Sequence, residues 1–266
     1  MDNYMQKNQK LWDELTPIHV RSDFYDVKGF KAGKCTLKSI ELEELGDVTG
    51  KSILHLQCHF GLDTLSWARL GADVTGVDFS KEAITLARSL SSETGIKAEF
   101  INSNIYDLPE NLKGEFDIVF TSYGIICWLP NLERWSDIIT RFLKPGGTFY
   151  MVENHPFMNA LDDSEDAIEP RVIYPYFHSS QPEKYHWEGG SYAVAAKISH
   201  PAYEWTHTLS DIINALISGG MRIEFLHEFP VSCWKALPFM VEDEKGLWRI
   251  PGDLVPLQFS IKARKV

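Results

Sequence analysis

The sequence predicts an α/β fold in which a mostly parallel seven-stranded sheet carries helices on both faces. Between residues 51 and 155, short apolar segments alternate with amphipathic segments at the spacing of βαβ units. The apolar segments lack a polar alternation, which is typical of parallel strands buried on both faces. A late helix followed by two further strands predicts that the last strand joins the sheet antiparallel to its neighbours.

The elements of this core follow from local signals. The five expected strands are residues 52–56, 73–78, 98–102, 116–121 and 148–152. A helix is expected after Gly61, and a second helix begins where Ser80 can cap its amino terminus. A third helix spans 132–143, and the sequence Lys-Pro-Gly-Gly at 144–147 breaks it before the fifth strand.

Four segments divide the chain. Residues 1–50 form a mostly helical cap with an aromatic loop, and residues 51–155 form the core. Residues 156–206 are rich in Pro, Tyr, His and Trp, interrupt the βα pattern and predict an inserted aromatic-rich lid, with a hairpin at 190–197. Residues 207–266 complete the sheet, with a helix at 209–218 and strands at 222–229 and 257–263.

Composition narrows the functional class. The chain is 44% hydrophobic and 24% charged, as expected of a globular protein, and its formal charge is −11. An acidic surface repels phosphate backbones, so no nucleic-acid partner is expected. No segment approaches the roughly 20 apolar residues of a membrane span. Four widely separated cysteines favour reduced thiols and a cytoplasmic location; the oligomeric state stays open.

Ligands of such sheets bind at the carboxyl ends of the strands. Asp78 ends the second strand, where its carboxylate can accept hydrogen bonds from both ribose hydroxyls or can cap the next helix. The first turn carries Gln57, His59 and Leu62 at the three glycine positions of a dinucleotide-binding motif, so a pyrophosphate could not approach the backbone. The turn therefore disfavours NAD and FAD.

The segment 53–152 resembles the core of class I S-adenosylmethionine-dependent methyltransferases, which have a Rossmann-like fold. Residues 55–61 stand where that family has Asp/Glu-x-Gly-x-Gly-x-Gly, with Gly61 kept and His55 in the acidic position. The other matching segments are Val77-Asp78-Phe79-Ser80, Asn104-Ile105, Phe116-Asp117-Ile118-Val119 and Leu143-Lys144-Pro145-Gly146-Gly147. The resemblance implies S-adenosylmethionine as cofactor and S-adenosylhomocysteine as product.

The resemblance also implies roles for individual residues. Asp78 would bind the ribose, Phe79 would pack on adenine, and Asn104 with Ile105 would reach the adenine amino group. Gln57 could replace the missing acid toward the methionine ammonium group. Residues 12–30 resemble the cap of small-molecule methyltransferases with a Gln-Cys-His-Phe-Gly motif, which would place Tyr25 over the methionine end. The expected cofactor-binding residues are Tyr25, Gln57, Cys58, Gly61, Asp78, Phe79, Asn104, Ile105 and Thr121.

Methyl transfer from a sulfonium is an in-line displacement that requires alignment at about 3 Å and exclusion of water. A general base is needed only for a protonated acceptor, and the candidates are His155 and His19. Tyr123 and Trp128 are expected in the substrate pocket. Cys58 is expected to be a packed thiol. No metal is expected, because the histidines of the insertion lack metal-ligand spacing; these are His178, His186, His200 and His207.

The leading hypothesis is therefore methyl transfer to an O, N or S atom of a small molecule. Two alternatives remain open: an NAD-dependent oxidoreductase on the same fold, and a non-catalytic S-adenosylmethionine-binding module. A bulky side chain at Gly61 is expected to block the cofactor turn and leave the fold largely intact.

Overall fold

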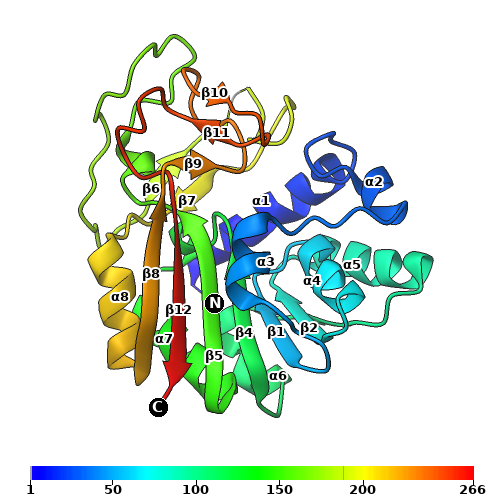
Figure 1. Cartoon of the computed structure of the whole chain (residues 1–266). Helices are drawn as coiled ribbons and strands as arrows, with labels where there is room; N and C mark the ends of the chain where they lie inside the picture. Colours follow the sequence, from blue (N-terminus) through cyan, green and yellow to red (C-terminus); the bar gives the residue numbers. More distant parts are fainter. Residues whose placement is uncertain (1, 188) are drawn as a thin grey trace.

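The computed structural model describes residues 2–187 and 189–266 and contains the predicted seven-stranded sheet (Figure 1). Its strand order is β3-β2-β1-β4-β5-β12-β8. The strands are β1 (Ser52–Leu56), β2 (Asp73–Asp78), β3 (Glu99–Asn102), β4 (Phe116–Ser122), β5 (Leu143–Asn154), β8 (Met221–Phe229) and β12 (Gln258–Lys265). Strands β1 to β5 pair in parallel, and β12 lies antiparallel between β5 and β8, which confirms the predicted antiparallel last strand.

Helices cover both faces of the sheet, as predicted (Figure 1). They are α4 (Leu62–Arg69), α5 (Lys81–Thr94), α6 (Leu108–Asn111), α7 (Leu132–Phe142) and α8 (Leu209–Ser218), with the 3-10 turns η1 (Ile105–Asp107), η2 (Ile126–Trp128) and η3 (Met158–Ala160). Neighbouring residues of a strand face opposite cores: Val119 packs in the cluster that contains Trp135 of α7, and Ile118 packs in the cluster that contains Trp67 of α4. Both tryptophans are fully buried.

The amino-terminal cap consists of α1 (Asn3–His19), α2 (Val27–Lys31) and α3 (Ser39–Leu45). Asp2 caps α1 by accepting a hydrogen bond from the Met5 amide at 2.8 Å. The segment expected as an aromatic loop contains α2, whose amino terminus is capped by the Asp26 side chain. Helix α1 contacts α5 of the core and β7 of the insertion, so the cap touches both parts.

Two predictions within the core and the insertion were wrong in detail. The Lys-Pro-Gly-Gly sequence at 144–147 does not delay the fifth strand; β5 begins at Leu143 and absorbs these residues through a register shift against β4. The hairpin expected at 190–197 is reduced to one bridge between Ser191 and Val194. The paired strands lie on either side of it, as β6 (Glu183–Tyr185) and β7 (Ala202–Glu204).

A second excursion, between β8 and β12, was not predicted. It forms a small sheet of β9 (Val231–Ser232), β10 (Val241–Glu242) and β11 (Trp248–Arg249). This sheet lies with β6 and β7 above the end of the main sheet at which the parallel strands finish (Figure 1). None of the helices in the described residues is long and apolar enough to cross a membrane.

Candidate functional site

A cavity of about 1180 Å³ lies at the carboxyl ends of the parallel strands. Its wall combines the cap, the strand-end turns, the insertion and residues 233–237 with Trp248 of the small sheet. Most of the residues predicted for the cofactor and substrate line it: Tyr25, Gln57, Cys58, Gly61, Asp78, Phe79, Asn104, Ile105, Tyr123 and Trp128. The strand-end rule therefore located the cavity correctly.

The turn after β1 keeps a glycine-like backbone although only one of its three glycine positions, Gly61, is a glycine. Gln57, His59 and Gly61 have φ angles of 56°, 49° and 79°. These are the three glycine positions of the Asp/Glu-x-Gly-x-Gly-x-Gly pattern, and the left-handed region costs a residue with a side chain about 1 kcal/mol or more. Strain of this kind persists where the surrounding structure imposes it, which is common at functional sites.

The same turn carries two buried polar atoms with no hydrogen-bond partner in the described residues, Gln57 Oε1 and His59 Nδ1. Gln57 is anchored through its Nε2, which donates to the Ile125 carbonyl at 3.1 Å. An unpartnered buried acceptor costs about 1–3 kcal/mol. The side-chain amide of Gln57 is thus fixed at the cavity wall, where its oxygen Oε1 can still accept a hydrogen bond from a ligand.

Asp78 is buried at the end of β2 and its two carboxylate oxygens order the neighbouring turns. The His59 amide donates to Oδ2 and the Ser80 amide donates to Oδ1, each at 2.8 Å. Burial raises the pKa of Asp78 to about 6, so the carboxylate is mostly ionised at neutral pH. Each oxygen retains acceptor capacity toward the cavity, as a pair of ribose hydroxyls requires.

Gly61 performs a different task from the one predicted. A Cβ at this position would lie 2.6 Å from Cε1 of Phe100 and 3.2 Å from Cβ of Ala87. The missing side chain therefore leaves room for the packing between β3 and α5, besides allowing the positive φ angle. The expectation that a bulky residue here would spare the fold was wrong, because the clash is with the core.

The adenine-side candidates lie close together, although some of their polar groups are already used. Asn104 Oδ1 accepts from the Tyr106 amide at 2.8 Å, and its Nδ2 lies 3.5 Å from Met5 Sδ. The Phe79 carbonyl accepts from Gln9 and from Asn102. The cap thus reaches the adenine side through α1.

Tyr25 and His19 close the cavity from the cap. The Tyr25 ring lies 4.7 Å from the Phe60 ring and 5.5 Å from the His59 ring, centroid to centroid. Its hydroxyl bonds to Tyr192 of the insertion. His19 is fully buried behind this wall, where its ring nitrogens contact His59 Nε2 at 3.2 Å and Ser191 Oγ at 2.9 Å. Burial lowers the pKa of His19 to about 4.

The loop after β4 is organised by Glu153, which the sequence did not single out as a separate residue. Its buried carboxylate accepts hydrogen bonds from the amides of Gly124, Ile125 and Ile126, and from its neighbour Asn154. This arrangement holds Trp128 at the cavity wall, with its indole N–H donating to the Gly124 carbonyl at 2.8 Å.

Besides His19, two further predicted residues lie away from the cavity wall. Thr121 is fully buried inside β4 and does not line the cavity. His155 follows β5, but its Nδ1 accepts from the Phe157 amide at 3.0 Å and its Nε2 lies 3.0 Å from Glu228 Oε1. The Nδ1 contact orders the turn that follows β5, Nε2 faces Glu228 of β8, and His155 is also absent from the cavity wall.

His55 stands near the end of β1, at the position where the family motif has an acidic residue, and it does not replace that acid. The His55 imidazole contacts Thr64 Oγ1 at 2.8 Å, and burial lowers its pKa to about 3, so the ring is neutral. Asp63 in the first turn of α4 does line the cavity as a buried carboxylate. No motif pointed to Asp63 beyond its position in the first turn of a helix.

The far half of the cavity, here called the acceptor chamber, is acidic and aromatic. Its carboxylates are Asp163, Glu183 and Glu204, and its rings include Trp128, Tyr174, Tyr185, Trp187 and Trp205. Glu183 and Glu204 are direct partners in the β6–β7 pair. In the described residues, neither forms an ion pair with Lys or Arg, and the Glu204 carboxylate accepts no hydrogen bond. Burial, with Asp163 and Glu183 adding repulsion, raises the pKa of Glu204 to about 7.

Comparison with known proteins agrees with this architecture. Residues 53–147 match the family model described as a methyltransferase domain. The chain is 28% identical over 194 residues to a ubiquinone biosynthesis O-methyltransferase of Bordetella avium, covering 69% of this chain and 75% of the relative. It is 33% identical over 121 residues to the Vibrio atlanticus protein of the same name, covering 45% and 51%.

Solved structures share the fold. A methyltransferase from Mesorhizobium loti, described as S-adenosylmethionine dependent, superposes with a TM-score of 0.58 at 20% identity, covering 88% of this chain and all of that one. The glycopeptide N-methyltransferase MtfA in complex with sinefungin superposes with a TM-score of 0.58 at 13% identity, covering 88% and 87%. The matched domain and the named relatives support an S-adenosylmethionine-dependent methyltransferase, and the strand order and the solved structures show the Rossmann-like fold of the class I enzymes.

Proposed function

We propose that this methyltransferase acts on a small molecule and that the attacking atom is the nitrogen of a basic amine. The acceptor chamber carries the proposal: three carboxylates and several aromatic rings face it, with no Lys or Arg ion pair to those carboxylates in the described residues. Like charges that directly oppose each other across two strands are destabilising. A cationic guest relieves this repulsion, and aromatic faces attract the same charge.

The other half of the cavity, here called the cofactor half, is formed by the strand-end turns around Gln57 and Asp78. It offers polar atoms that match those of S-adenosylmethionine. Asp78 offers two carboxylate oxygens for the ribose hydroxyls, and the unpartnered Gln57 Oε1 offers an acceptor for the methionine ammonium group. Asp63 is a second candidate for that ammonium. The cofactor supplies a methyl group activated on a sulfonium.

Glu204 is the candidate proton acceptor. A protonated amine has no lone pair with which to attack, so Glu204 would first have to accept its proton. The neutral nitrogen can then form the N–CH₃ bond as the S–CH₃ bond breaks, which leaves a thioether. A carboxylate with a pKa of about 7 is matched to that task near neutral pH. Its wall position in the acceptor chamber favours it over His155, which lies off the cavity, and over His19, which is packed behind Tyr25.

The relatives suggest a competing acceptor class. Two of them are named ubiquinone biosynthesis O-methyltransferase, and those names specify attack by oxygen. The acceptor chamber of this chain can differ from that of the V. atlanticus protein, because the match spans only about half of that protein. Matched pairs of amines and phenols of equal size separate the two classes.

The experiment measures initial rates of S-adenosylhomocysteine release with such a panel, for the wild type and Glu204→Gln. We expect turnover of amines and a kcat/KM that rises as pH passes through about 7, with that inflection lost and kcat/KM at least about tenfold lower in Glu204→Gln. Turnover of phenols alone would reject the amine. Cofactor binding without any turnover across the panel would favour a non-catalytic binding module. Calorimetric titration with S-adenosylhomocysteine and NAD in parallel checks the cofactor independently.

A further inference from the structure

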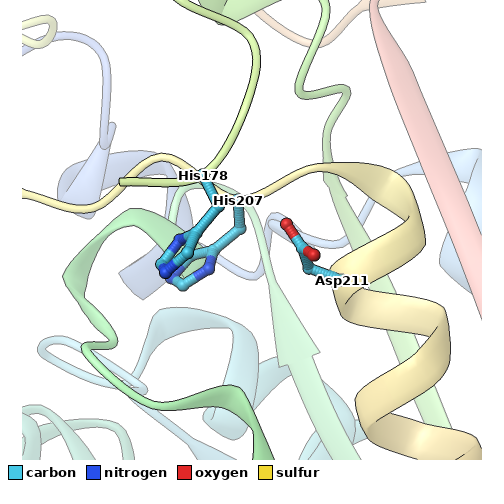
Figure 2. A group of neighbouring side chains, drawn as sticks. All are labelled: His178, His207 and Asp211. Carbon is cyan, nitrogen blue, oxygen red and sulfur yellow. The ribbon is translucent and has the colours of Figure 1, made fainter. Parts of the chain in front are cut away.

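Three potential metal ligands meet at the margin of the cavity, at the start of α8 (Figure 2). His178 comes from the insertion, His207 precedes α8, and Asp211 lies in its first turn. One ligand atom of each lies within 4.8 Å of the other two. The spacing of these three residues in the sequence did not predict the group, because residue 178 comes close to residue 207 only in the folded chain.

Backbone carbonyls fix the protonation of both imidazoles. His178 Nδ1 lies 2.8 Å from the Thr206 carbonyl, and His207 Nε2 lies 2.7 Å from the Leu129 carbonyl. A carbonyl only accepts hydrogen bonds, so each of these nitrogens carries the proton. The lone pairs of the neutral rings are left on His178 Nε2 and His207 Nδ1. Metal-binding histidines characteristically donate their other N–H to a carbonyl or carboxylate in this manner.

Asp211 keeps one carboxylate oxygen for a ligand. Its Oδ2 accepts from the Thr208 amide at 2.8 Å in the capping box of α8, whereas Oδ1 accepts no hydrogen bond in the described part of the chain. The carboxylate therefore keeps one oxygen available to an ion besides the hydrogen bond that caps α8.

The geometry is compact enough for an ion. The two imidazole rings are nearly parallel, with centroids 5.1 Å apart. In a tetrahedral zinc site, bonds of about 2.0–2.1 Å place ligand atoms roughly 3.3 Å from each other. The three ligand atoms, all within 4.8 Å of one another, are thus close to that spacing, and the side chain of His178 is exposed.

We propose that His178, His207 and Asp211 bind a divalent transition metal ion, with zinc as the best match to two imidazoles and one carboxylate. Three protein ligands leave a fourth position for water. Because His178 belongs to the insertion and the other two ligands to the core, a bound ion fixes the insertion beside the acceptor chamber, whose wall includes His207. This site is independent of the proposed amine acceptor.

The test is calorimetric titration of tag-free, chelator-treated protein with zinc chloride. We expect one ion per chain with micromolar or tighter affinity, and binding at least about tenfold weaker in His178→Ala. His200→Ala is the matched control, because His200 is an exposed histidine of the same insertion that contacts Glu14 instead of the group. It should bind zinc like the wild type.

Thermal unfolding supplies a second readout. Zinc should raise the unfolding midpoint of the wild type and of His200→Ala, and should not raise that of His178→Ala or Asp211→Asn. The Asn side chain keeps an oxygen to accept the Thr208 hydrogen bond, so this variant should fold. Absence of saturable zinc binding, or unchanged binding in both His178→Ala and Asp211→Asn, would overturn the proposal.

Discussion

The two halves of the cavity are built from different kinds of structure. The cofactor half consists of turns that leave parallel strands, and the residues that shape it are braced by the core, as Asp78 and Gly61 are. The acceptor chamber consists of the insertion and the small sheet, which meet above the strand ends (Figure 1). One half is positioned by regular secondary structure and the other by long excursions from it.

This difference between the two halves indicates where specificity for the acceptor can change. Residues of the cofactor half are tied to the packing of β1 to β3, so substitution there costs stability or cofactor affinity. The acceptor chamber is formed in part by the short strands β6 and β7, which lie outside the main sheet, so the side chains that face the chamber can vary with little effect on the core of that sheet. Under the proposed function, the negative charge gathered around Glu204 serves to bind the acceptor and does not stabilise the fold.

The largest expected effect is on cofactor affinity in Asp78→Ala. Loss of a charge-assisted hydrogen bond costs about 1.5–3 kcal/mol, which corresponds to roughly 10- to 100-fold weaker binding. Calorimetric titration with S-adenosylhomocysteine measures the change, and circular dichroism checks the fold. Asp73→Ala, at the exposed opposite end of β2, is the control and should bind normally. Wild-type affinity in a folded Asp78→Ala protein would remove Asp78 from the site.

The bracing of the cofactor turn by the core predicts a stability loss in Gly61→Ala. Gly50→Ala is the matched control, because Gly50 has a similar φ of 71° but no atom within 4 Å of its would-be Cβ. Both variants pay the left-handed strain of about 1–2 kcal/mol. Only Gly61→Ala adds the clash with Phe100, which we expect to cost about 1–3 kcal/mol more. Urea unfolding measures both; equal losses would mean that Phe100 moves aside freely.

The same contrast explains what the sequence could and could not predict. The central strands of the core were predicted closely because they are short apolar segments that are largely buried, and Asp78 was singled out because the end of such a strand is a defined place. The register of the cofactor-turn motif could be recognised although only one of its three glycines, Gly61, is present. Gln57 and His59 do adopt the positive φ angles that the register implies.

The acceptor chamber was not readable in this way. Glu183 and Glu204 meet because β6 and β7 pair across 16 intervening residues, and no periodic pattern marks three-residue strands. His178 and Asp211 meet for the same reason, through a long-range return of the chain. His155 was chosen for its position after the fifth strand, but side-chain direction at a strand end depends on contacts such as Glu228, which the sequence does not reveal.

Within the cofactor half, Gln57→Leu separates the two ends of the ligand. Removing Oε1 should weaken S-adenosylmethionine binding by about tenfold, since one hydrogen bond to a charged group is lost. Affinity for 5′-methylthioadenosine, which lacks the amino-acid end, should not change. Asp63→Asn is the companion variant. If only Asp63→Asn weakens S-adenosylmethionine selectively, Asp63 is the partner of the ammonium and Gln57 is not.

The smallest expected effect is at the boundary between the two halves, in His155→Gln. His155 is buried and its nitrogens face Phe157 and Glu228, away from the cavity. The Gln side chain retains a hydrogen-bond acceptor and a donor, so we expect kcat/KM for the acceptor to stay within about twofold of the wild type and its pH profile to be unchanged. The pH profile of kcat/KM for Glu204→Gln, measured alongside, shows the change expected when a proton acceptor is lost. A flattened profile in His155→Gln instead would place the base after β5, and the acidic chamber would then serve only to attract the acceptor.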